Sequence, residues 1–83
     1  MWKVYILRST KKRWYYVGST NRLDARVNEH NSGKVRSTKS FMPLELVFSK
    51  DFNLESEARN YERLVKDKRI LKESLIEEIE NRK

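Results

Sequence analysis

The chain has 83 residues with no cysteine and one histidine, which excludes disulfides, zinc fingers, iron–sulfur clusters, cysteine nucleophiles and multi-histidine metal sites. Any metal must therefore sit on carboxylates, and such ligands suit Mg²⁺ or Mn²⁺. The longest apolar runs, residues 4–7 and 14–17, are far shorter than a membrane span. We expect a single domain over residues 1–83, in the cytoplasm and without a membrane partner.

The net charge of +7 is unevenly distributed along the chain. Residues 1–42 hold ten Lys and Arg and two acidic residues, a net of +8. Residues 43–83 hold nine Lys and Arg and ten acidic residues, a net of −1. This asymmetry indicates a polyanionic partner, with nucleic acid as the first candidate, while the plain alternative is charge that serves solubility.

Two strands are predicted at the N-terminus, at residues 2–8 and 14–18, because both segments are β-branched and aromatic without a helical period. The polar turn between them predicts a hairpin. Because the first strand is apolar on both faces, we expect other elements to cover both sides of the sheet. One face carries Trp2, Val4 and Ile6, and the other carries Tyr5 and Leu7.

A helix over residues 22–31 is predicted after the hairpin, with N-cap candidates at Ser19–Asn21 and a stop at Gly33. Residues 34–42 read as a basic loop. Residues 44–48 follow as a third strand. Its apolar residues alternate, which predicts one shared face for Leu44, Leu46 and Phe48.

Two more helices are predicted in the second half of the chain. Asn53 can cap a helix that runs to about Arg69, and residues 70–80 carry apolar side chains at helical spacing. The order is β-β-α-β-α-α. It predicts an α+β fold with a small three-stranded antiparallel sheet flanked by helices.

Arg22, Arg26 and His30 lie four residues apart on the first predicted helix, beside the apolar pair Leu23 and Val27. At 100° per residue, His30 lies about 20° and Arg26 about 60° from Leu23, so both stand at the rim of the buried stripe. Each has a plain interpretation, an Arg extending from the core edge and a hydrogen-bonded His. The alternative is a phosphate site, because a guanidinium forks onto phosphate oxygens.

Glu62 lies on the apolar face of the second predicted helix, which is defined by Ala58, Tyr61 and Val65. An unpaired buried carboxylate is costly, so Glu62 needs a cation. The candidates are Lys66 four residues on, an Arg from elsewhere, or a metal ion.

Tyr5 and Tyr16 lie on strands that are expected to be adjacent, and Gly18 follows two residues after Tyr16. Aromatic residues of a hairpin usually belong to the core. A Gly inside a strand, however, often marks a close approach of backbone or ligand. Both interpretations stay open on this pattern alone.

Taken together, these residues resemble the motifs of the GIY-YIG nuclease family. The two name-giving motifs correspond to Lys3-Val4-Tyr5 and Tyr16-Val17-Gly18. Arg26 follows in a helix, and Glu62 lies in the later segment 57–63. The order and spacing match over residues 2–72. The stretches 30–34 and 43–47 further resemble the small stand-alone bacterial branch of that family.

The resemblance implies hydrolysis of a DNA phosphodiester assisted by one divalent metal, Mg²⁺ or Mn²⁺. It implies Tyr16 as the base that activates water and Tyr5 as the group that orients nucleophile and phosphate. Arg26 would bind the scissile phosphate, and His30 would tune Tyr16 or bind phosphate. Glu62 would hold the metal. A tyrosine, with a pKa of about 10, needs nearby cations for such a role at neutral pH.

Two classes of function remain open. One is a metal-dependent DNA endonuclease acting on duplex, branched or single-stranded DNA; the other is a module of the same fold that binds nucleic acid without cutting it. The five filled chemical positions favour the enzyme. A third option is a subunit that pairs with another protein or a second copy through helix 70–80. The residues expected to contact nucleic acid are Gly18, Arg22, Lys34, Arg36 and Lys39.

Overall fold

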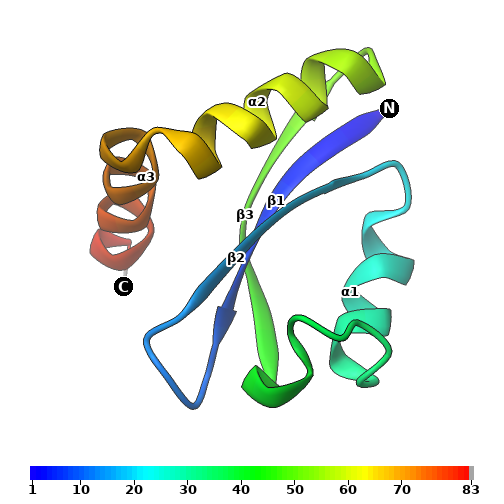
Figure 1. Ribbon diagram of the computed structural model, residues 1–83, viewed down its shortest axis with the longest axis vertical. Helices are drawn as coiled ribbons and strands as arrows, with labels where there is room; N and C mark the ends of the chain where they lie inside the picture. The colour runs from blue at the N-terminus through cyan, green and yellow to red at the C-terminus, as the bar shows by residue number, and fades with distance from the viewer. Residues whose placement is uncertain (83) are drawn as a thin grey trace.

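The computed structural model describes residues 1–82 and confirms the α+β class and the order β-β-α-β-α-α (Figure 1). A short 3₁₀ turn, η1, lies in the loop before the third strand. The bounds are β1 (Trp2–Ser9), β2 (Tyr15–Thr20), α1 (Leu23–Asn31), η1 (Lys39–Phe41), β3 (Leu44–Phe52), α2 (Glu55–Asp67) and α3 (Arg69–Asn81).

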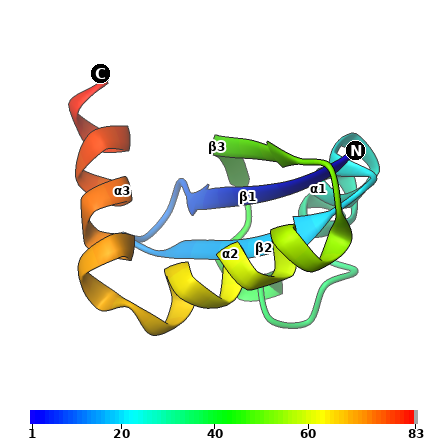
Figure 2. The same cartoon turned by 90° about the horizontal axis from the view of Figure 1, so that it is seen from above.

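The three strands form one antiparallel sheet in the order β2-β1-β3, so β1 is the central strand. Alternate residues of β1 point to opposite faces, as predicted. Val4 and Ile6 belong to the main apolar core with Ala58 and Val65 of α2. In Figure 2, α2 runs along this face of the sheet and α3 stands across its end. We call this the α2 face.

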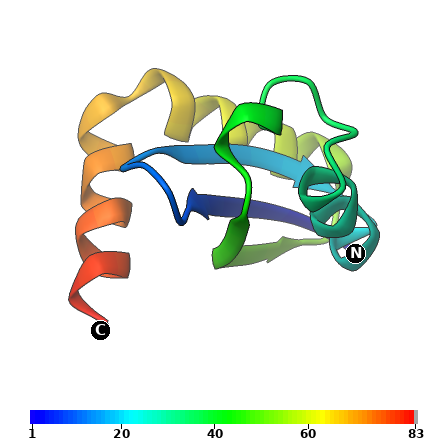
Figure 3. The ribbon, with the colours of Figure 1, turned by 90° about the horizontal axis from the view of Figure 1, so that it is seen from below.

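The opposite face is covered by α1 and by the segment that joins α1 to β3, which Figure 3 shows in green. Here Tyr5, Leu7 and Leu44 form a second, smaller buried cluster. Leu23 and Val27 of α1 pack against it, as their spacing predicts. We call this the α1 face.

Strand β3 differs from its prediction in length and in register. It continues to Phe52, because the polar residues after Phe48 pair with the first half of β1. A bulge shifts its register between Ile6 and Leu7. The expectation of one shared face is therefore wrong: Leu44 lies on the α1 face, Phe48 packs on the α2 face, and Leu46 is exposed.

The helix starts also differ from expectation. Arg22 is the N-cap of α1 and has no side-chain cap bond; its N–H donates to the Thr20 hydroxyl at 3.0 Å. Leu54, not Asn53, caps α2, and its N–H donates to the Glu57 carboxylate at 3.3 Å.

The third helix starts right after the second, with Lys68 between them. Ile79 is buried, and Leu71, Leu75 and Ile76 pack against the same core, so this apolar stripe is used within the chain. Ile70 is exposed. Among residues 1–82, no helix is both long and apolar enough to cross a membrane.

Candidate active site

A polar cleft of about 360 Å³ opens at the free edge of β2. Side chains of β1, β2, α1 and α2 line it. We call it the β2-edge cleft. Its lining residues are Trp2, Tyr5, Tyr16, Gly18, Ser19, Thr20, Asn21, Arg22, Arg26, Arg59 and Glu62.

The strand register brings the two tyrosines together. Tyr5 pairs with Gly18 and Leu7 with Tyr16, so the tyrosines are diagonal neighbours on the α1 face, with ring centroids 6.2 Å apart. A Cβ at Gly18 would lie 2.6 Å from the Tyr5 hydroxyl. The close approach that a Gly in this strand predicts is therefore the approach of the Tyr5 side chain.

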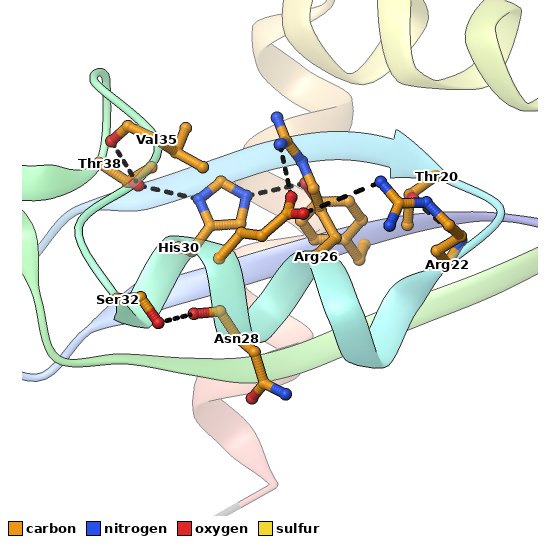
Figure 4. Close-up of polar contacts among 10 residues, drawn as sticks. Thr20, Arg22, Arg26, Asn28, His30, Ser32, Val35 and Thr38 are labelled. Carbon is orange, nitrogen blue, oxygen red and sulfur yellow. Dashed lines mark hydrogen bonds and ion pairs between the residues drawn. The ribbon is translucent and has the colours of Figure 1, made fainter.

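Tyr5 and His30 form a buried polar pair behind the cleft. The Tyr5 hydroxyl lies 3.0 Å from His30 Nε2, and His30 Nδ1 lies 2.8 Å from the Thr38 hydroxyl. Figure 4 shows His30 between the helix and the loop that carries Thr38. His30 and Thr38 have no exposed surface.

These surroundings change the acidity of both groups. Burial, with a smaller contribution from Tyr16, raises the pKa of Tyr5 to about 12. Burial and then the Arg26 cation lower the pKa of His30, so the imidazole is neutral at pH 7. A phosphate cannot reach His30, and its hydrogen bond goes to Tyr5 rather than to Tyr16. Burial thus contradicts the expected phosphate contact of His30, whereas its ring centroid lies 4.9 Å from that of Tyr16 and the tuning of Tyr16 stays a prediction.

Arg26 stands at the rim of α1, as its position on the helix predicts. Its side chain is 34% exposed, and its Nη1 donates to Glu29 Oε1 at 3.0 Å. Arg22 Nη2 lies 3.9 Å from the other oxygen of Glu29. The hydrogen bond with Arg26 lowers the pKa of Glu29 and raises that of Arg26. Glu29 therefore holds two cations at the cleft, Arg22 and Arg26, which Figure 4 labels.

Glu62 enters the cleft from α2 with its side chain 18% exposed. Ser19 Oγ donates to one carboxylate oxygen at 2.5 Å and Lys66 Nζ donates to the other at 2.7 Å. Burial raises the pKa of Glu62, but the hydrogen bonds from Lys66 and Ser19 outweigh it and lower the pKa, so the carboxylate is ionised. Of the cations that the sequence offered as partners for Glu62, Lys66 is the one that pairs with it in the structure.

The basic loop lies apart from the cleft. Lys34, Arg36 and Lys39 are exposed between α1 and β3, and none of the three lines the cleft or joins an ion pair within residues 1–82. Asn31, the last residue of α1, joins the two ends of the loop, because its side-chain amide makes hydrogen bonds of 2.8 and 2.7 Å with the backbone of Leu44, the first residue of β3.

Sequence reasoning missed several residues of this region. Ser19 and Arg59 line the cleft, and Asn31 and Thr38 fix the loop. Asn31 stands next to His30 in a stretch singled out above, which was a usable signal. No pattern in the sequence pointed to Thr38. A larger hollow, of about 540 Å³, lies between the hairpin and α3, and it contains none of the predicted site residues.

Comparison with known proteins gives a consistent result. The sequence profile of the GIY-YIG catalytic domain matches residues 1–72, a span that contains every residue lining the β2-edge cleft. The UPF0213 protein YazA of Bacillus subtilis (strain 168) is 40% identical over 81 residues, which are 95% of this chain and 81% of that protein. A UPF0213 protein of Vibrio campbellii is 35% identical over 79 residues, 93% of this chain and 75% of that protein.

A solved structure is also similar. The solution NMR structure of the UPF0213 protein BH0048 from Bacillus halodurans matches with a TM-score of 0.57 and 35% sequence identity. The match covers 93% of this chain and 84% of that one.

Proposed function

The chain belongs to the GIY-YIG family, and from this membership we propose that it is an endonuclease that hydrolyses DNA phosphodiester bonds in the β2-edge cleft with the help of one divalent metal ion. The observation that carries the proposal is the convergence of Tyr16, Arg26 and Glu62, from β2, α1 and α2, on one polar cleft.

Arg26 binds the scissile phosphate in this proposal. Glu29 accepts from one of its terminal nitrogens at 3.0 Å, and the guanidinium has further N–H groups that can donate to phosphate oxygens. A guanidinium that is already oriented stabilises the charge that develops in the transition state without rearrangement at that moment.

The two tyrosines divide the proton chemistry between them. Tyr5, with its pKa raised to about 12, keeps its proton and orients the attacking water and the phosphate. Tyr16 is partly exposed in the cleft and has the Lys66 ammonium 5.8 Å from its ring centroid. We therefore assign to Tyr16, acting as the phenolate, the removal of a proton from water, which converts it to the phenol.

Glu62 is the residue that would hold the metal. Within residues 1–82 no cluster of three or more acidic or histidine side chains is available. A single carboxylate fits Mg²⁺ or Mn²⁺, because these ions take one or two carboxylates and complete their shell with water and phosphate oxygens. When bound, the ion neutralises phosphate charge and favours ionisation of water. Glu62 would exchange its bond with Lys66 for this role.

The alternative is a module that binds nucleic acid without cutting it. One observation favours it: both carboxylate oxygens of Glu62 already have partners in Ser19 and Lys66. The exposed cations Lys34, Arg36 and Lys39 would serve either function by contacting phosphates beside the cleft.

The experiment that separates the two is a cleavage assay on single-stranded, duplex, flapped and branched DNA of one sequence, with Mg²⁺, with Mn²⁺ and with a chelator. The nuclease predicts products on at least one substrate that require the added ion. Salt-sensitive binding of the same substrates without any products, with either ion, would establish the binding module instead.

A further inference from the structure

A chain of hydrogen bonds runs from the cleft through the protein interior to the basic loop. It joins the Tyr5 hydroxyl to His30 Nε2 at 3.0 Å, His30 Nδ1 to the Thr38 hydroxyl at 2.8 Å, and that hydroxyl to the Val35 carbonyl at 3.3 Å. All the side chains in it are buried, and no buried side-chain nitrogen or oxygen among residues 1–82 lacks a partner. Figure 4 shows its course from His30 to Thr38 and Val35.

The end of this chain offers an acceptor for the Thr38 hydroxyl proton. The Val35 carbonyl accepts from the Thr38 backbone N–H at 3.2 Å, and it lies 3.3 Å from the Thr38 hydroxyl, which can donate its proton to the same oxygen. With that direction, the Thr38 oxygen accepts from His30, and Nδ1 is the protonated nitrogen. A neutral imidazole carries one proton, so Nε2 is bare and accepts from the Tyr5 hydroxyl.

We propose that Thr38 is a positioning residue, which holds His30 in the Nδ1–H tautomer and thereby turns the proton of the Tyr5 hydroxyl away from the cleft. The lone pairs of Tyr5 then face the cleft, where they accept a hydrogen bond from the attacking water or from Arg26. With the opposite tautomer, Nε2–H would donate to Tyr5 and occupy a lone pair, and the Tyr5 proton would turn elsewhere. The effect on catalysis rests on the proposed function; the tautomer does not.

His30 is the only histidine of the chain, so its two ring nitrogens can be read without assignment. We would record the long-range ¹H–¹⁵N correlation spectrum of the ¹⁵N-labelled protein at pH 7.5, without DNA or metal. We expect a pyrrole-type shift at Nδ1 and a pyridine-type shift at Nε2. The opposite assignment, or a doubly protonated ring, would overturn the proposal with no variant involved.

Two variants test whether the Thr38 hydroxyl sets the tautomer of His30. Thr38→Val keeps the shape but leaves no acceptor, so His30 should change to the Nε2–H tautomer, and cleavage should slow by on the order of tenfold. Thr38→Ser keeps the hydroxyl and should retain both the Nδ1–H tautomer and the wild-type rate. A Val variant with an unchanged tautomer, or a Ser variant that changes it, would contradict the assignment. If the wild type cuts no DNA, the proposed function fails and the tautomer result stands.

Discussion

The two faces of the sheet are built from alternate residues of one strand, yet they differ in kind. On the α2 face, Val4 and Ile6 pack against Ala58 and Val65, all of them buried and all apolar. On the α1 face the neighbouring residue, Tyr5, reaches a buried His and Thr. The α2 face thus buries hydrocarbon, whereas the α1 face buries polar groups beside a smaller apolar cluster.

The difference separates the face that supplies the main apolar core from the face that carries the buried polar groups next to the cleft. Apolar burial contributes roughly 25 cal/mol for each Å² removed from water. A buried polar group, in contrast, is costly unless every bond is made, and it gains strength and direction in return. On the α1 face, polar side chains occupy part of the interior, and their hydrogen bonds orient the Tyr5 hydroxyl at the cleft. Substitutions on the two faces should therefore affect different measurements.

The largest expected effect is on the α1 side of the cleft. Arg26→Ala should slow cleavage about 10²–10³-fold, because it removes a donor from the phosphate in the transition state. Its free energy of unfolding should stay within about 1 kcal/mol of wild type, since the side chain is 34% exposed. Arg26→Lys should recover little activity, because the fork geometry is lost. Single-turnover rates and urea melts measure both; a variant that unfolds, or one that cuts normally, would show that Arg26 is structural.

The matching substitution on the other face should do the reverse. Val65 has no exposed surface, and Val65→Ala should lower the free energy of unfolding by about 2 kcal/mol through lost burial and a cavity. Cleavage per folded molecule should remain within about twofold of wild type. A loss of activity as large as that of Arg26→Ala, in protein shown by urea melts to be folded, would mean that the two faces are not separable.

A smaller effect is expected from the basic loop on the α1 face. If about four cations contact phosphates, the logarithm of the affinity for duplex DNA falls with the logarithm of salt with a slope of roughly −3 to −4. Changing Lys34, Arg36 and Lys39 together to Ala should make that slope shallower by about 2 to 3. The control with the same loss of charge is Lys68, Arg69 and Lys72 to Ala, at the start of α3. Equal slopes for the two triple variants would remove the case for a specific phosphate contact by the loop.

The smallest expected effect is a loss of stability at acidic pH. The folded protein holds His30 neutral with a lowered pKa, whereas the unfolded chain binds a proton near pH 6.5. The unfolded state therefore binds more protons below that pH, and stability should fall on acidification. Between pH 7.5 and 5.5 the loss is at most about 1.4 kcal/mol. Urea melts at the two pH values measure it, and the difference should vanish in His30→Gln. A wild type that is more stable at pH 5.5 would mean that His30 is charged in the folded state.

The sequence was sufficient where the pattern is local or the motif is long. The two faces of β1 follow from its alternation, and the position of Arg26 follows from helical spacing. Glu62 was found because a carboxylate on an apolar stripe needs a partner, and the pair with Lys66 was among the partners considered.

The remainder depends on contacts between segments that no local pattern encodes. Strand β3 passes through the polar residues 49–51 because β1 pairs with it there, and Lys3 and Asp51 form an ion pair of 2.6 Å across the two strands. The bulge in β3 appears only once both strands are aligned. Thr38 was missed because its partner His30 lies on another element, and a single Thr in a polar loop has no periodicity to mark it.

Glu62 offers the most direct test of the central claim, that the cleft is a metal-dependent nuclease site. Glu62→Gln keeps an acceptor oxygen and removes the negative charge that a hard cation requires. Its control is Glu78→Gln, since Glu78 forms the same i,i+4 pair, with Arg82 at 2.9 Å, on α3 away from the cleft. We predict that Glu62→Gln loses both Mg²⁺-dependent DNA cleavage and the thermal shift that Mg²⁺ causes in wild type, while Glu78→Gln keeps both. If Glu62→Gln cuts DNA as fast as Glu78→Gln does, and differs only by a lower melting temperature without metal, Glu62 is a structural partner of Lys66 and the claim is wrong.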